Sequence, residues 1–262
     1  MWRNIYENPV AITLKNQTEG TRFLAKNGFP LHANFGLIYR MSNTAGYNPF
    51  RLKGYGKLNL DQPEIASLLG TKFVDFKYLE TLGDNWKNEG AFKLKRGFME
   101  NKHALPRAFF IQKSRFEPSF DLPSSVKKGE FEPQKLVYLD KEFPNVEGEI
   151  LESVVTRYQN TGDEIEVDLT NATPGFLFVS EVYYPGWRAS VNGKDTVVLR
   201  ANQVFCAVRL ESPSGKGSSN RIKFTFQPRS FTLGACVSTA AFLSMALFWM
   251  FSIFKIRFSR ES

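Results

Sequence analysis

The chain has few of the residues that build metal centres and disulfide scaffolds: its 262 residues include two cysteines and two histidines. Two cysteines cannot form the several disulfides that hold a small secreted scaffold together, so that class is excluded. His32 and His103 lie far apart in sequence, and no zinc-binding or Cys-His nucleophile spacing is present. We therefore predict no metal site and no cofactor in this chain.

A secretory signal is also lacking. The first 20 residues contain no basic segment followed by an apolar core and a small-residue cleavage site. If residues 1–229 lie outside the cytoplasm, a segment upstream of Met1 must deliver them. If no such segment exists, the chain is a tail-anchored cytoplasmic protein.

Long uncharged runs are absent except for one, the 25 residues Ser230–Phe254. About 20 apolar residues cross a bilayer core, and a buried core helix seldom runs this long without a polar face. Aromatic residues end the run and basic residues follow it, which is typical of a cytoplasmic helix end. We predict a membrane-spanning helix at 230–254 and a basic cytoplasmic tail at 255–262. Small residues share one face of this helix and would let another membrane helix approach closely: Gly234, Ser238, Ala241 and Ser244.

Charge of one sign does not dominate the chain. The formal net charge of +8 is the remainder of three opposed blocks, +9 over residues 1–115, −9 over residues 116–181 and +8 over residues 182–262. Such a distribution argues against nucleic acid as a partner. The basic first block fits anionic lipid head groups or a polyanionic polymer, although a solvated mixed surface is the commoner explanation.

The first block predicts a small mixed α/β subdomain at residues 1–115. Thr18 and Glu19 precede the apolar pair at 23–24, and Gly28 follows, which predicts a short helix. A second short helix is predicted at 64–69 and a strand at 71–76. Residues 108–112 are another short apolar run.

The remainder of the soluble part predicts a β-sandwich. Residues 116–148 hold four prolines and read as a connector with at most short strands. Apolar and charged residues then alternate at 164–169 and 221–226, and Asn192-Gly193 predicts a two-residue hairpin. The fold class is therefore α+β, in which the mixed subdomain precedes an antiparallel, jelly-roll-like sandwich at 149–229 and one membrane helix.

Two groups of residues suggest binding chemistry. Glu164, Glu166 and Asp168 place three carboxylates on one strand face, which suits Ca²⁺ or acid/base work, but a solvated outer sheet face explains them better. Aromatic and polar side chains that stack on sugars and hold anions gather in two segments. From the first we take as substrate-binding candidates Arg40, Tyr47, Asn48 and Arg51. The second contains Trp187, for which core packing is the favoured interpretation.

Several stretches resemble the C-terminal region of the YfhO-type bacterial membrane protein family: GYNPFRL (46–52), LLGTKFV (68–74), ALPRAFF (104–110), YYPGWRASVNGK (183–194) and FTFQPRSF (224–231). The resemblance implies a polytopic protein, with many membrane helices, an extracytoplasmic domain and a final helix. It also implies similarity to GT-C glycosyltransferases, which transfer sugars from a polyprenyl-phosphate carrier to cell-envelope polymers. This chain has only the final helix, so no catalytic residue is inherited.

Our leading hypothesis is the extracytoplasmic C-terminal portion of such a glycosyltransferase-like protein, in the bacterial cell membrane with a cytoplasmic C-terminus. Its partners would be the lipid bilayer, a polyprenyl-phosphate-linked sugar, a cell-envelope polymer and other transmembrane helices, but not nucleic acid. The alternative is a non-catalytic membrane-tethered β-sandwich that binds glycan or a protein partner. Whether the chain is part of an enzyme is left open.

Overall fold

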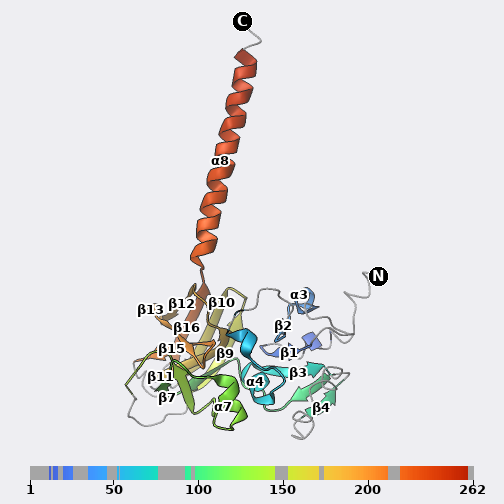
Figure 1. The fold of residues 1–262 in the computed structure, drawn as a ribbon, viewed down its shortest axis with the longest axis vertical. Coiled ribbons are helices and arrows are strands. Elements are labelled where there is room, and N and C mark those ends of the chain that lie inside the picture. Colours follow the sequence, from blue (N-terminus) through green and yellow to red (C-terminus); the bar gives the residue numbers. More distant parts are fainter. Residues whose placement is uncertain are drawn as a thin grey trace.

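In the computed structural model, the described residues are 12, 14–16, 20–25, 35–45, 52, 54–75, 92–95, 98–144, 153–170, 174–211 and 219–258. They form a mostly β globular part, from which one long helix projects (Figure 1). The predicted α+β class with a C-terminal apolar helix is confirmed.

The first sheet is mixed and built from the N-terminal part of the chain. In spatial order its strands are β2 (Ser42–Asn43), β1 (Arg22–Leu24), β3 (Thr71–Asp75), β5 (Phe98–Asn101) and β4 (Phe92–Lys95). Strand β1 runs parallel to β2 and β3, and the β3–β5 and β5–β4 pairs are antiparallel. The helical segments of this region are α3 (Phe35–Tyr39), η1 (Tyr55–Lys57) and α4 (Pro63–Leu68). The predictions of a short helix at 64–69 and a strand at 71–76 are confirmed to within one residue at the ends.

The predicted helix around Phe23 and Leu24 is wrong, because these residues lie in strand β1. Phe23 packs into one apolar cluster with Phe73, while Leu24 packs into another with Val74. Successive strand residues point to opposite faces, so both side chains are buried only if this segment is a strand between two neighbours. Tertiary pairing has overridden the local helix signals.

A six-stranded sheet forms the centre of the globular part. In spatial order its strands are β6 (Ala108–Ile111), β11 (Gly175–Val182), β15 (Phe205–Leu210), β14 (Val198–Ala201), β8 (Leu136–Leu139) and β7 (Lys113–Phe116). All pairs are antiparallel except β7–β8, which is parallel. One face packs with α4 and α7 (Leu122–Lys127) around an apolar cluster that includes Leu68, Leu122 and Phe178. The connector between two domains predicted at 116–148 stays a prediction. Strands β6 and β7, which begin before it, and β8, which lies within it, all belong to this sheet.

The other face of the central sheet packs against a five-stranded antiparallel sheet, which completes the sandwich. In spatial order its strands are β13 (Lys194–Thr196), β12 (Trp187–Val191), β16 (Ser219–Phe226), β10 (Glu164–Thr170) and β9 (Val154–Asn160). Val167, Ile222 and Phe224 fill the space between the sheets. The predicted hairpin is confirmed, since Asn192 and Gly193 join β12 to β13 with φ of 51° and 79°.

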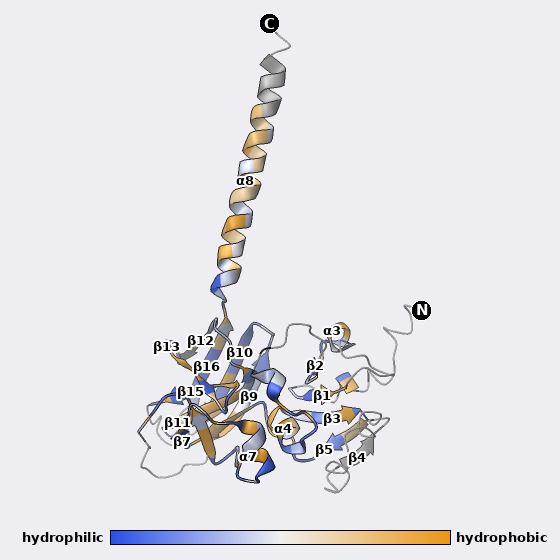
Figure 2. Cartoon of the chain, viewed as in Figure 1, coloured by the Kyte–Doolittle hydropathy of each residue, from blue (hydrophilic) through white to orange (hydrophobic). Residues whose placement is uncertain are grey.

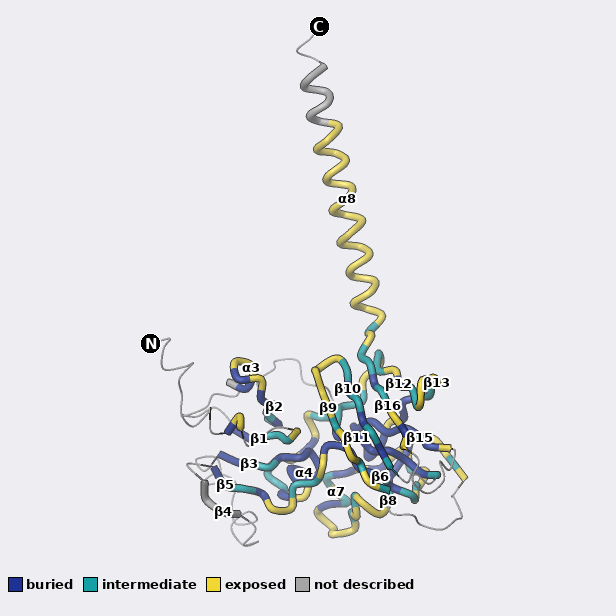
Figure 3. The backbone as a smooth tube through the Cα atoms, turned by 180° about the vertical axis from the view of Figure 1, so that it is seen from behind, coloured by how far each residue is buried: buried dark blue, intermediate teal, exposed yellow. Residues whose placement is uncertain are grey.

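Helix α8 (Arg229–Phe258) follows β16 after Gln227 and Pro228. Residues Arg229–Phe251 are long and apolar enough to cross a membrane, and none of this stretch is buried against the globular part. At 1.5 Å per residue the 23 residues extend about 35 Å, against about 30 Å for a bilayer core. Figure 2 shows its apolar character and Figure 3 its exposure along the described length. The predicted membrane helix is therefore confirmed as an apolar helix of spanning length.

Candidate functional site

The four predicted substrate-binding residues are placed only in part. Arg40 lies directly after α3, with an exposed side chain and a left-handed backbone φ of 56°. Tyr47, Asn48 and Arg51 lie outside the described residues. This candidate site therefore remains a prediction.

The three carboxylates of β10 lie on the outer face of the five-stranded sheet and are paired with basic side chains. Glu164 Oε2 is 2.8 Å from Lys223 Nζ, and Asp168 Oδ1 accepts a hydrogen bond from Arg221 Nε at 3.0 Å. Glu166 Oε2 lies 3.6 Å from Arg157 Nη1. Among the described residues no group of His, Cys, Asp or Glu side chains is arranged to hold a metal ion. The preferred interpretation, a solvated outer face, is confirmed.

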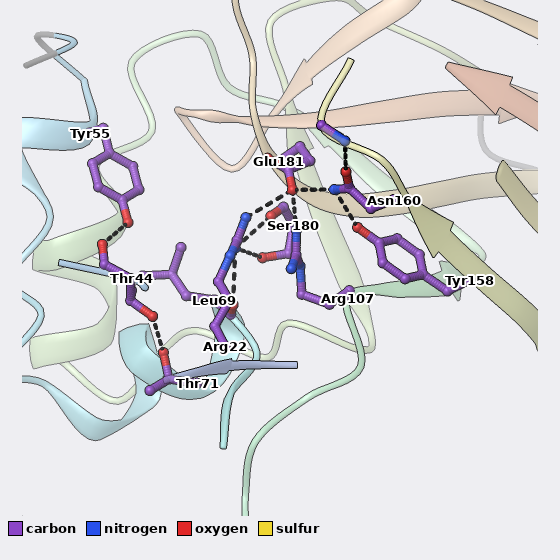
Figure 4. Close-up of polar contacts among 11 residues, drawn as sticks. Arg22, Thr44, Tyr55, Leu69, Thr71, Arg107, Tyr158, Asn160, Ser180 and Glu181 are labelled. Carbon is purple, nitrogen blue, oxygen red and sulfur yellow. Dashed lines mark hydrogen bonds and ion pairs between the residues drawn. The ribbon is translucent and has the colours of Figure 1, made fainter. Parts of the chain in front are cut away.

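A different charged group joins the first sheet to the sandwich, and we call it the junction cluster: Arg22, Arg107, Tyr158, Asn160, Ser180 and Glu181 (Figure 4). The Oε1 atom of Glu181 accepts hydrogen bonds from Arg22 Nη2 at 2.9 Å and from Asn160 Nδ2 at 3.0 Å. Arg107 Nη2 donates to the same oxygen. Two guanidinium groups thus share one carboxylate.

Arg22 contacts several elements at once. It lies in β1 of the first sheet, and its Nη1 donates to the Ser180 carbonyl of β11 at 2.7 Å and to the Leu69 carbonyl, just after α4, at 3.0 Å. The Ser180 hydroxyl lies 3.1 Å from the same nitrogen. One side chain therefore ties β1, α4 and the central strand of the sandwich together.

A second polar contact runs beside the cluster (Figure 4). Tyr55 of η1 packs against the apolar cluster of the central sheet and donates its hydroxyl to the Thr44 carbonyl at 2.8 Å. The Thr44 and Thr71 hydroxyls lie 2.7 Å apart and are both buried. Burial raises the pKa of Tyr55 above its ordinary value. This line of contacts fixes the end of the first sheet against the sandwich.

The junction cluster is removed from solvent. The side chains of Arg107, Arg22 and Glu181 are 4%, 11% and 19% exposed. Burial, and then the neighbouring Arg22, lower the pKa of Arg107. Its Nε has no hydrogen-bond partner, and its guanidinium lies 5.4 Å from the centre of the Tyr158 ring, a cation–π contact. Burial also raises the pKa of Tyr158.

The chemistry of this cluster suits attachment. Three donors converge on one oxygen of its only carboxylate, Glu181 Oε1, which suits holding the two parts together. Breaking such a buried group costs far more than breaking a surface pair. The sequence analysis missed the cluster, although one signal was present: Glu181 follows the six buried residues Gly175–Ser180 of β11.

The connection to the membrane helix is the second site, which we call the α8 root: Tyr184, Gly186, Trp187, Phe226, Gln227 and Pro228. Backbone hydrogen bonds hold the end of β16 from both sides, from Phe226 N to Asp163 O and from Gln227 N to Gly186 O, each at 2.7 Å. The Phe226 ring lies 5.2 Å from that of Trp187. Trp187 packs against the sandwich core as predicted, but it is only half-buried.

The backbone conformation and close packing at position 186 of the α8 root require a glycine. Its φ of +124° is strained for any other residue, and a Cβ there would lie 2.9 Å from Pro228 Cα. The loop between β11 and β12 therefore touches the backbone that enters α8. Pro228 precedes the helix, where its missing N–H breaks no helical hydrogen bond. These contacts fix the direction in which α8 leaves the sandwich.

Together these features define a class: among the described residues, a mostly β globular part is followed by a single helix that is long and apolar enough to cross a membrane. In a comparison with protein families, residues 118–238, somewhat less than half of the chain, match the family described as bacterial membrane protein YfhO. The match confirms the resemblance for the stretches at 183–194 and 224–231, and the matched segment includes the α8 root and Glu181 but not Arg22 or Arg107. Searches of curated proteins and of solved structures found no match.

Proposed function

We propose that the globular part lies outside the cytoplasm and serves as the C-terminal portion of a polytopic, GT-C-like protein that uses a lipid-linked sugar to modify cell-envelope polymers. The observation that supports this proposal best is the fixed α8 root inside the segment that matches the YfhO family. A rigid connection holds the sandwich at a set height over the bilayer. Such a connection suits a domain that positions a polymer above an active site built by membrane-embedded helices.

The role we assign to the described residues is positioning. A glycosyl transfer needs a general base for the acceptor hydroxyl and cations for the leaving phosphate. The carboxylates of β10 and of the junction cluster are all occupied by basic partners. Arg40 and Arg51 would supply cations, while the base would come from membrane-embedded parts of such a protein.

A second candidate function is a non-catalytic module tethered by α8 that binds glycan or a protein partner. The same pairing of carboxylates favours it, because a binding module needs no free base. The two functions differ in one measurable respect: only the first links residues of this chain to the rate of glycosylation.

The orientation is tested by labelling from outside the cell. In a Cys236→Ser background, Val154→Cys places a thiol on an exposed strand end, while Cys206 stays buried in the sandwich. A membrane-impermeant maleimide should label Val154→Cys in intact spheroplasts. Labelling only after lysis would place the globular part in the cytoplasm and refute the proposal.

The role in glycosylation is tested in the complete protein in its native membrane. Arg40→Asn and Arg51→Ala should reduce polymer glycosylation without lowering the amount of protein in the membrane. Lys223→Ala, which removes an exposed cation from the outer sheet face, is the matched control. Unchanged glycosylation in both arginine variants would favour the non-catalytic module.

A further inference from the structure

Helix α3 exposes apolar side chains that none of the described residues covers. Gly36 and Tyr39 are buried, whereas Leu37 is 81% and Ile38 44% exposed. At 100° per residue, residues 36 and 39 share one side of a helix, and residues 37 and 38 flank the opposite direction. The buried side packs on the first sheet through Tyr39, so Leu37 and Ile38 project away from it.

This exposed face lies on the side of the molecule from which α8 leaves. Figures 1 and 3, which differ by half a turn about the long axis, both show α3 at the level of β12 and of the α8 root. Because the root fixes the direction of α8, a bilayer that α8 spans would begin near this level. Helix α3 therefore lies near the level at which the surface of that bilayer would begin.

Several exposed side chains at this level are of kinds that a bilayer interface accepts, and the exposed Asp163, whose carbonyl accepts from Phe226 N, adds one acidic group beside them. Tyr184 of the α8 root is 44% exposed, and its ring lies 6.2 Å from that of Phe226. Arg40 follows α3, and Arg188 and Arg229 flank the root; all three arginines are exposed. Aromatic residues, short apolar faces and adjacent cations are typical of contact with acyl-chain boundaries and phosphate head groups.

We propose that α3 docks on the bilayer that α8 spans, with Leu37 and Ile38 in the interfacial layer and Arg40 against lipid phosphates. The α8 root and α3 would then be two points of contact, which together hold the globular part against the bilayer surface. The contact requires only that α8 spans the membrane. It does not depend on the glycosyltransferase role.

The test places a fluorophore on the full chain in lipid nanodiscs of phosphatidylcholine and phosphatidylglycerol. In a Cys236→Ser background, Leu37→Cys is labelled, and Val154→Cys is the matched control. Val154 is an exposed apolar residue at the opposite end of β9 from the α8 root, about 20 Å along the strand. Brominated lipid should quench the label at position 37 and leave that at 154 unchanged, and aqueous iodide should do the reverse. Ile38→Cys repeats the test if Leu37→Cys does not fold.

Two results would overturn the proposal. Equal iodide quenching at 37 and 154 would show α3 in water, and protection of position 37 from both quenchers would show it covered by protein. Arg40→Asn then tests the phosphate contact, because asparagine tolerates the left-handed φ of 56° while the charge is lost. It should abolish any difference in brominated-lipid quenching between anionic and zwitterionic nanodiscs. Persistence of that difference would remove Arg40 from the contact.

Discussion

The sandwich has two connections, and they are built by opposite means. The junction cluster joins it to the first sheet through charges, in which Arg22 and Ser180 are 158 residues apart in sequence. The α8 root joins it to the membrane helix through a close backbone contact and aromatic packing between residues 184–187 and 226–228. The junction cluster depends on the carboxylate of Glu181, which all three donors share. The α8 root depends on Gly186, because any side chain at that position would meet Pro228.

This difference decides how each connection would fail. Removal of one member of a buried ionic group leaves the others charged and unpaired in a poorly solvated place. Addition of a methyl group at a backbone contact forces the two segments apart and leaves the charges elsewhere untouched. Substitutions at the two sites should therefore differ in both the size and the kind of their effect.

The largest effect is expected from Glu181→Ala. It removes the acceptor of Arg22, Arg107 and Asn160 and should lower the free energy of unfolding by about 3–5 kcal/mol. Urea denaturation of the full chain in nanodiscs, followed by circular dichroism, measures this loss. Glu181→Gln retains an acceptor oxygen and should fall between the wild type and Glu181→Ala.

The matched control is Glu166→Ala on the outer face of the sandwich. Glu166 lies 3.6 Å from Arg157, whose side chain is 46% exposed, so its loss should cost about 1 kcal/mol or less. Similar losses for Glu181→Ala and Glu166→Ala would mean that the junction cluster is no stronger than a surface pair. The proposed contrast between the two connections would then fail.

The next largest effect is expected from Gly186→Ala in the α8 root. Gly193 also has a positive φ, but a Cβ there meets nothing within 4 Å, so Gly193→Ala should cost only the left-handed strain of about 1–2 kcal/mol. Gly186→Ala adds the clash with Pro228, about 1–3 kcal/mol beyond that control. Equal losses of unfolding free energy for the two variants would show that the Gly186–Pro228 contact yields freely.

The same contrast explains what could be predicted from the sequence. The β12–β13 hairpin and the apolar run of α8 are local features of the sequence, and the pattern of apolar and charged residues reveals strands β10 and β16 directly. Strand β1 was missed because its burial comes from neighbours outside its own segment, Ser42–Asn43 and Thr71–Val74. The junction cluster was missed for the same reason, since no spacing in the sequence brings Arg22 near Glu181.

The candidate site residues also fall into those that sequence patterns explain and those whose surroundings only the structure shows. The three carboxylates of β10 were recognised as an outer face because their alternation with apolar residues is a short-range pattern. Arg40 was selected for its residue type beside an aromatic residue, and the structure adds two facts that no pattern contains: its positive φ and its place next to the exposed face of α3. Position in space, which sequence patterns do not encode, is what gives this residue a testable role.

The smallest expected effect is a change in how the free energy of unfolding depends on pH, which should differ between substitutions at the junction and at the α8 root. Burial raises the pKa of Tyr55 and of Tyr158, so both hydroxyls stay protonated in the folded state above their ordinary pKa of 10.0. Below pH 10 neither state loses these protons, and the stabilisation is complete. As the pH rises above 10, the unfolded chain releases them first, and the junction should lose stability.

The double variant Tyr55→Phe, Tyr158→Phe removes these protons. At pH 7 it should cost about 0.5–1.5 kcal/mol for each of two lost hydrogen bonds, Tyr55 to the Thr44 carbonyl and Asn160 to the Tyr158 hydroxyl. Its unfolding free energy should then fall less steeply than that of the wild type above pH 10, whereas Gly186→Ala should keep the wild-type slope because it leaves both hydroxyls in place. Parallel pH profiles for the double variant and the wild type would show that the buried tyrosines do not govern the alkaline stability of the junction. In that case the contrast between a charge-based and a steric connection would rest on Glu181 and Gly186 alone.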